Sequence, residues 1–254
     1  MRLTRCYVPA PLHAGSTRVL PADVSTHVAR VLRARVGQLL TLFDGRGGEY
    51  DATILAIERG GVRVQIDQHR PIERESPVAV LLLQALARGE RMDQIVQKAT
   101  ELGATAIVAW GGERSVVRLD APGLARRCEH WRAIAISACE QCGRNQVPRI
   151  DAVADLAAAC RQADATGLRL LLSPQADEPL TSQLHNALGI NLLIGPEGGF
   201  GDDELALAAQ HGFQACRLGP RVLRAETAPL AALAAIQALA GDFQCAADAR
   251  GGFD

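Results

Sequence analysis

The hydrophobic pattern along the chain changes character near residue 78. Before that point, apolar and polar positions alternate in three short segments rich in β-branched residues, 38–43, 50–57 and 62–66, which predicts strands. After it, continuous apolar runs alternate with segments of helical spacing, which predicts a mostly parallel α/β sheet. Further strands are expected at 78–83, 105–110, 168–172, 190–194 and 213–218, and helices at 92–102, 123–142 and 228–240.

A helix is expected to interrupt the first, strand-rich region. Asp23 is in a position to cap its start, and one face is apolar: Val24, Val28, Val31 and Leu32. Its far end is basic and carries Arg30, Arg33 and Arg35. These arginines are explained either as a solvated helix end favoured by the dipole or as a phosphate-binding patch, and spacing alone favours the first explanation.

Residues 71–77 (PIERESP) have the composition of a linker, with two prolines, three charges and almost no apolar content. The net charge changes sign at the same place, from +4 over residues 1–70 to −5 over the remainder. We therefore expect a small β-rich domain at 1–72, an α/β domain at 73–243 and a loose tail at 244–254. RNA contact, if present, is expected to be local because the second part is acidic.

The overall composition is that of an ordinary globular protein, with 48% hydrophobic and 22% charged residues among 254. No apolar run has the length of a membrane span and the N-terminus lacks a signal-peptide core, so no membrane association and a cytoplasmic location are expected. Seven scattered cysteines do not suggest a disulfide framework. The Cys139–Cys142 pair lacks a second pair or a nearby histidine, so no metal is expected.

Two glycine-rich turns each follow an apolar run. The first is Gly195-Pro196-Glu197-Gly198-Gly199 and the second is Leu218-Gly219-Pro220-Arg221. Ligands of open α/β sheets lie beyond the carboxyl ends of strands, so these turns are candidates for two walls of one pocket. Glu197 would repel a phosphate, and neither turn matches a phosphate-binding pattern. The pocket is therefore expected to take a neutral or partly cationic ligand.

The sequences GPEGGF (195–200) and LGPRVLRAET (218–227) resemble the bacterial 16S rRNA uridine-N3 methyltransferase family (RsmE type) of the SPOUT superfamily. The similarity covers the chain from about Arg5 to Gly241. It also includes VLRARVGQLLTLFDGRGGEY (31–50), QALARGERMDQIVQKATELGA (84–104), GERSVVRL (112–119) and AISACEQCGRNQVPRI (135–150). Two departures are visible: Ala225 stands where the family commonly has Thr, and Arg88 where it often has Lys.

The resemblance implies a PUA-like β-barrel followed by a SPOUT α/β domain with a C-terminal trefoil knot. It implies a homodimer, S-adenosylmethionine as cofactor, and 16S rRNA or the small ribosomal subunit as partner. The cofactor-binding residues that it implies are Leu172, Ser173, Ile194, Gly195, Glu197, Gly198, Gly199, Leu218, Gly219, Val222, Leu223 and Thr227. The RNA-binding residues that it implies are Arg5, Arg30, Arg33, Arg35, Arg114 and Arg144.

The chemistry of uracil methylation suggests candidates for catalysis. The N3 proton must leave while negative charge on the ring oxygens is stabilised. Arg224 or Arg221 could donate to those oxygens, and Glu197 or Glu226 could accept the proton or orient the cofactor's amine. The alternative for the two glutamates is capping of free N–H groups near helix starts, and for Glu226 capping is the better explanation. For Arg114 the alternative is a surface ion pair.

Two other functions are compatible with parts of the pattern. One is a related SPOUT methyltransferase that acts on another RNA position, such as a ribose 2′-hydroxyl. The other is a non-catalytic RNA-binding protein with a vestigial pocket. The intact glycine-rich turns argue against the second of these, and the matches at 84–119 and 135–150, outside the pocket, argue against the first.

Overall fold

The computed structural model describes residues 4–111, 121–184 and 187–244, and these fall into two compact units. Unit 1 contains the residues up to Glu75 together with Cys139–Val147, and unit 2 contains Ser76–Ala138 and the residues from Pro148 onward. The segment 139–147, expected to belong wholly to the second domain, is thus part of unit 1. No helix in the described part of the chain has the length and apolar character needed to cross a bilayer.

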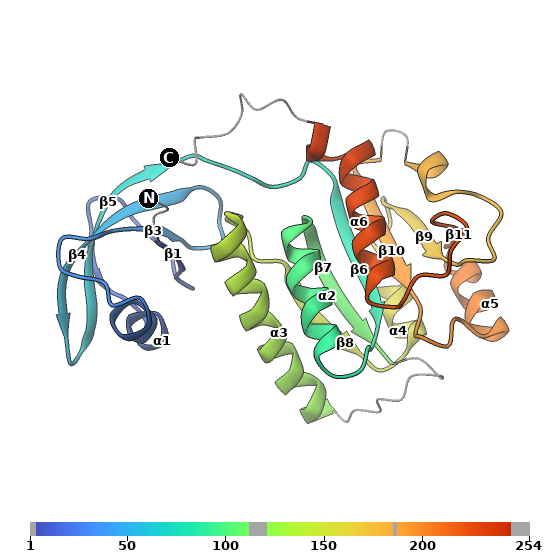
Figure 1. The fold of residues 1–254 in the computed structure, drawn as a ribbon, viewed down its shortest axis with the longest axis horizontal. Coiled ribbons are helices and arrows are strands. Elements are labelled where there is room, and N and C mark those ends of the chain that lie inside the picture. The colour runs from blue at the N-terminus through green and yellow to red at the C-terminus, as the bar shows by residue number, and fades with distance from the viewer. Residues whose placement is uncertain (1–3, 112–120, 185–186, 245–254) are drawn as a thin grey trace. The chain divides into compact units, whose positions relative to one another are not determined.

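Unit 1 is built on a five-stranded sheet in the order β1-β3-β4-β5-β2 (Figure 1). Its strands are β1 (Thr4–Tyr7), β2 (Thr17–Val19), β3 (Leu39–Phe43), β4 (Glu49–Glu58) and β5 (Gly61–Arg70). All pairings are antiparallel except β1 with β3. Register shifts between β4 and β5 mark β-bulges, which bend and twist the sheet so that one face encloses an apolar core.

The helical segment of unit 1 differs from the expected helix in two respects. Helix α1 (Ala22–Thr26) begins after Pro21 without a side-chain cap, so the capping role predicted for Asp23 was wrong. The chain then continues as a π-helical turn, η1 (His27–Val31), in which Leu32 N–H donates to the His27 carbonyl. Because the wider turn rotates the following side chains, Val28 stays in the core whereas Val31 is 65% exposed.

Unit 2 contains a six-stranded, all-parallel sheet in the order β11-β9-β10-β6-β7-β8. Its strands are β6 (Ala79–Ala85), β7 (Ala104–Trp110), β8 (Arg149–Val153), β9 (Leu168–Leu172), β10 (Gly189–Ile194) and β11 (Gln214–Cys216). The chain moves outward from β6 through β7 to β8 and then crosses to β9 on the other side. Strands β6 and β10 therefore meet at the point where the direction of progress reverses.

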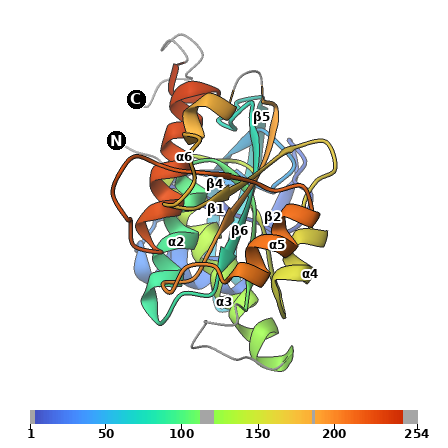
Figure 2. The same ribbon diagram turned by 90° about the vertical axis from the view of Figure 1, so that its right-hand side faces the viewer.

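Helices cover both faces of this sheet. They are α2 (Glu90–Glu101), α3 (Ala121–Cys142), α4 (Leu156–Arg161), α5 (Asp202–Gln210) and α6 (Thr227–Leu239), with short 3-10 turns η2 (Leu180–Gln183) and η3 (Asp242–Gln244). Figure 2 shows α2 and α6 on one side of the strands and α4 and α5 on the other. The predicted end of α2 is confirmed, because Gly103 follows it with a φ of 83°.

Helix α6 contains one buried polar residue, Gln237, in an otherwise apolar sequence. Its side-chain amide donates to the Leu102 carbonyl at 3.0 Å and accepts from the Ser76 hydroxyl at 2.7 Å. The same oxygen accepts from Asp242 N–H at 3.4 Å. Gln237 thus ties α6 to the end of α2 and to the first residue of unit 2.

Candidate functional site

The candidate site of unit 2 lies beyond the carboxyl ends of β9, β10 and the short edge strand β11. Strand β11 ends at Cys216, earlier than the expected 218, because Arg217 instead pairs with the segment before η2: its N–H donates to Glu178 and its carbonyl accepts from Leu180. Leu218 consequently belongs to the loop that leads to α6. Three turns thus leave neighbouring parallel strands at one edge, the position at which open α/β sheets bind ligands.

These turns enclose a cavity of about 960 Å³ together with the start of α2 and of α6. The residues that line it are Arg91, Leu172, Ser173, Pro174, Gln175, Ile194, Gly195, Pro196, Glu197, Gly198, Gly199, Phe200, Asp202, Leu205, Leu218, Gly219, Arg221, Val222, Leu223, Arg224, Ala225, Glu226 and Ala228. Eleven of the twelve residues expected to bind a cofactor are in this lining; Thr227, at the start of α6, is not. The four candidate catalytic residues, Arg221, Arg224, Glu197 and Glu226, are there as well.

Both glycine-rich turns need glycine, because of close packing at one position and positive φ at two others. A Cβ atom on Gly195 would approach a ring carbon of Phe200 to 2.8 Å, and Phe200 in turn stacks on the buried Trp110 with 6.1 Å between ring centroids. Gly199 and Gly219 adopt φ values of 71° and 72°, which residues with side chains rarely adopt. The glycines therefore keep the backbone of both turns close to the cavity.

The charges of the cavity wall are balanced, with three arginines and three carboxylates. Arg91, at the start of α2, bridges two of the carboxylates: its Nη1 lies 3.3 Å from Glu197 Oε1 and its Nε lies 3.8 Å from Glu226 Oε1. Glu226 is the N-cap residue of α6, yet its side chain makes no capping hydrogen bond, so the capping explanation for this residue was wrong. Its Oε2 is buried without a hydrogen-bond partner.

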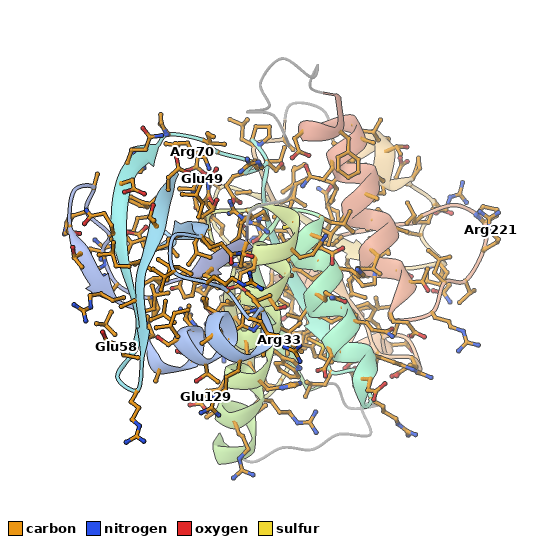
Figure 3. The ribbon with its side chains drawn as sticks, turned by 60° about the vertical axis from the view of Figure 1, so that its left-hand side comes forward. Arg33, Glu49, Glu58, Arg70, Glu129 and Arg221 are labelled. Atoms are coloured by element: carbon orange, nitrogen blue, oxygen red, sulfur yellow. The ribbon has the colours of Figure 1, made fainter. Side chains whose placement is uncertain are left out.

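Arg221 and Arg224 are both exposed and belong to the loop that follows β11. Figure 3 shows the Arg221 side chain extending away from its loop. Val222 between them is 80% exposed, although it is a large apolar residue. The loop therefore presents two guanidinium groups and an uncovered apolar side chain beside the cavity. Behind the loop, burial raises the pKa of Cys216 to about 11, so its thiol is protonated at neutral pH.

The arginines expected to bind RNA fall into different environments. Arg30, Arg33 and Arg35 of unit 1 are exposed. Arg33 has a φ of 50°, a backbone conformation that residues other than glycine rarely adopt. Arg114 lies outside the described residues. Arg144 is instead buried inside unit 1 and the Arg5 side chain is only 9% exposed, and both pair with carboxylates.

Four arginines of unit 1, one buried and three partly buried, surround two glutamates. Glu49 is paired with Arg5, with Arg70 at 2.9 Å and with Arg74 at 3.1 Å, and Figure 3 shows Arg70 beside it. Glu75 is paired with Arg144 at 2.6 Å. We call these six residues the buried arginine network. Burial alone would raise the pKa of Glu49, but Arg5 and Arg74 outweigh this and hold it below its ordinary value.

Asn145 completes the attachment of the segment after α3 to unit 1. Its Oδ1 accepts from Arg5 at 2.7 Å and its Nδ2 donates to the Ile72 carbonyl at 2.6 Å. The segment after α3 therefore fastens residues of unit 1 to one another. This geometry gives Arg5 and Arg144 a structural role and leaves neither guanidinium facing solvent.

Sequence reasoning missed Arg91 as a site residue. Arg91 lies within the stretch 84–104 that resembles the family, in the segment that follows β6, and the turn after this strand opens on the same edge as the other turns. A basic residue at a helix start opposes the helix dipole, and that local inconsistency was the available signal. Pro174, Gln175 and Phe200 were also missed.

The class of protein is an RNA methyltransferase whose methyltransferase domain is preceded by an RNA methyltransferase PUA domain. Residues 74–237 match the model of the RNA methyltransferase domain family, and residues 20–67 match that of the RNA methyltransferase PUA domain family. The chain is 34% identical over 246 residues to ribosomal RNA small subunit methyltransferase E of Mycobacterium bovis, covering 95% of this chain and 94% of that protein. It belongs to the ribosomal RNA small subunit methyltransferase E family.

Two solved structures share the whole fold, an α/β SPOUT domain preceded by a PUA-like domain. One is ribosomal RNA small subunit methyltransferase E of Neisseria gonorrhoeae bound to S-adenosyl methionine, with 40% identity, a TM-score of 0.90, and coverage of 95% of this chain and 100% of that one. The other is a methyltransferase of Legionella pneumophila in complex with the bound cofactor SAM, with 39% identity, a TM-score of 0.91, and coverage of 96% and 100%.

Proposed function

We propose that this protein transfers a methyl group from S-adenosylmethionine to N3 of a specific uridine in small-subunit ribosomal RNA. The observation that carries the proposal is the cavity at the carboxyl ends of β9, β10 and β11, with its balanced charges and two exposed arginines. Family membership supports the reaction class and the ribosomal substrate. The N3 position is the finer part of the proposal and rests on the resemblance of the motifs and on the chemistry below.

The residues of the cavity fit S-adenosylmethionine. Its volume of about 960 Å³ is within the range of small-molecule sites, roughly 300–1,000 Å³. Glu226 Oε2 is a buried acceptor that lacks a partner, and a cationic ligand group would satisfy it. The close approach of Gly195 to Phe200 keeps the backbone of the first turn near the cavity, where its polar groups can bind an adenosine. When bound, S-adenosylmethionine supplies an electrophilic methyl group on a sulfonium sulfur.

The protein residues would then act on the uracil. Arg224 or Arg221 donates to a ring oxygen and stabilises the negative charge that builds up as N3 loses its proton. Glu226 or Glu197 accepts that proton or orients the cofactor's amine. The bond from the methyl carbon to N3 forms as the carbon–sulfur bond breaks, and the electron pair of that bond stays on sulfur. Holding the two reactants in line supplies much of the acceleration.

Unit 1 is proposed to contribute RNA binding through Arg30, Arg33 and Arg35. All three are exposed, and a strained backbone such as that of Arg33 is more frequent at functional positions. Arg114 stays a prediction. The trefoil knot and the homodimer are likewise proposals, the second supported by the 80% exposure of Val222, which a second copy would cover.

Mass-spectrometric nucleoside analysis tests the reaction directly. 16S rRNA and small ribosomal subunits, both from a strain lacking this activity, are incubated with the protein and S-adenosylmethionine. New 3-methyluridine is the expected product. Methylation at a ribose oxygen would replace the proposal by a 2′-O-methyltransferase. No methylation of either substrate, with RNA binding retained, would leave an RNA-binding protein.

A further inference from the structure

The pair of carboxylates that Arg91 bridges comes from two different turns of the cavity. Glu197 belongs to the turn after β10, and Glu226 immediately precedes α6. Arg91 belongs to a third element, the first turn of α2. One guanidinium therefore connects three walls of the cavity, and within the described part of the chain no other cation is found within 4 Å of either carboxylate.

The contacts of Arg91 with the two carboxylates are long. Arg91 lies 3.3 Å from one carboxylate and 3.8 Å from the other, so neither contact is a tight, two-pronged pair. Oε2 of Glu226 is buried without a hydrogen-bond partner and keeps its acceptor capacity. Arg91 thus offsets part of the negative charge of this wall without occupying all of its acceptors.

A charge in this position acts differently on the methyl donor and on the product. The donor carries a positive sulfonium, whereas the product of methyl transfer carries a neutral thioether and differs otherwise by one methyl group. Because the rest of the two molecules is the same, a change in the charge of the wall alters their relative affinity, and a general loosening of the cavity weakens both alike.

We propose that Arg91 is a specificity-determining residue that limits the preference of the cavity for the cationic methyl donor over its neutral product, by offsetting the charges of Glu197 and Glu226. This inference rests on the proposed use of S-adenosylmethionine. In the absence of Arg91 the wall would carry two uncompensated carboxylates, and the donor would gain affinity relative to the product. With Arg91 present, the dissociation constants of the donor and the product stay closer to each other, so the donor has a smaller advantage in competing with the product for the cavity.

Isothermal titration calorimetry on the full-length protein tests this, with S-adenosylmethionine and S-adenosylhomocysteine as ligands. Arg91→Gln removes the charge and Arg91→Lys keeps it. We expect the ratio of the two dissociation constants to move toward the donor by about 3- to 10-fold in Arg91→Gln, as for one charge interaction across a partly solvated site. Arg91→Lys should leave the ratio near that of the unchanged protein, and raised salt should reduce the difference.

A matched control is Arg149→Gln, which removes an exposed, ion-paired arginine of the same unit that is not in the cavity lining. Glu226→Gln should move the ratio in the opposite direction from Arg91→Gln. Arg91→Met gives the same ratio test if Arg91→Gln does not fold. Equal weakening of both ligands in the neutral variants would overturn the inference and leave Arg91 a structural residue. Failure of the unchanged protein to bind either ligand would instead overturn the proposed function.

Discussion

The arginines of unit 1 and those of the cavity loop in unit 2 are the same residue type in opposite situations. Arg5 and Arg144 are buried among carboxylates and other hydrogen-bond acceptors, whereas Arg221 and Arg224 are exposed beside a cavity. In the sequence, all four lie within the stretch that resembles the family, from about Arg5 to Gly241. The two pairs of arginines differ in whether a carboxylate of the protein lies beside them. Folding brings Glu49 to Arg5 and Glu75 to Arg144, although both glutamates are distant from these arginines in the chain.

The comparison teaches that an arginine's role depends on whether its partner is part of the protein. A guanidinium that is satisfied internally stabilises the fold, and removing its partner leaves an uncompensated buried charge. A guanidinium without an internal carboxylate is available to a ligand. The two groups should therefore respond to mutation through different measurements, stability for the first and turnover for the second.

The largest effect is expected in the buried arginine network. Glu49→Ala removes the carboxylate that Arg5, Arg70 and Arg74 share, and the free energy of unfolding should fall by about 3–5 kcal/mol. Chemical denaturation of the full-length protein measures this. Glu58→Ala is the matched control: it breaks the Arg63–Glu58 pair of the same unit, whose side chains are 46% and 61% exposed, and should cost less than about 1 kcal/mol. Similar losses in both variants would contradict the distinction between buried and exposed pairs.

The cavity arginines should show the opposite response. Arg224→Ala is expected to lower turnover by about 10²- to 10³-fold, as for the loss of one donor to a developing negative charge, with the unfolding midpoint nearly unchanged. Single-turnover methylation with saturating cofactor measures the rate. Arg217→Ala, an exposed arginine just after β11 that is not in the cavity lining, is the control and should retain normal turnover. A large loss of stability in Arg224→Ala would place this residue with the buried group.

Sequence reasoning found the elements with strong periodicity and missed those whose stability comes from tertiary contacts. The central strands β6, β9 and β10 were found because burial on both faces requires continuous apolar runs. Strand β8 and helix α4 were missed: β8 is a partly exposed edge strand, and α4 has only six residues. The π-turn after α1 has no recognised sequence signal, and it moved Val31 out of the core.

The site, like the fold, could be predicted from the sequence only in part. Backbone turns were located well, because glycine is required where a turn has positive φ or close packing, as at Gly219 and Gly195. Side-chain partners were located poorly, because Arg91 meets Glu197 and Glu226 across more than a hundred residues of sequence. The same limitation explains why Arg5 and Arg144 were assigned to RNA: their partners Glu49 and Glu75 cannot be paired with them by spacing.

Acid should weaken the buried arginine network through Glu49. The pKa of Glu49 is lowered in the folded state, so the unfolded chain binds the proton more readily, and the stability that Glu49 contributes is lost as pH falls below its ordinary range near 4.5. Glu140, whose pKa is raised by burial, acts in the opposite direction. Glu140 is present in both the unchanged protein and Glu49→Gln, so its contribution drops out of the difference between their unfolding free energies. It should shrink below pH 4.5, by at most about 1.4 kcal/mol per pH unit, and a difference independent of pH would contradict the assignment.

The smallest effect is expected at the exposed arginines of unit 1, where each neutralised phosphate adds only a little to binding. Arg30→Ala/Arg33→Ala should reduce the dependence of RNA affinity on salt, by about 0.7 to 0.9 in the logarithmic slope for each phosphate that the variant no longer neutralises, because fewer counterions are released. Fluorescence anisotropy with a labelled small-subunit rRNA fragment over a salt series measures the slope. Arg59→Ala, at an exposed arginine in the turn between β4 and β5, is the control for the loss of one positive charge from unit 1. If the double variant shows the same slope as the unchanged protein, Arg30 and Arg33 are a solvated helix end. Of these two sets of exposed arginines, only those of the cavity loop, Arg221 and Arg224, would then remain as candidates for binding a ligand.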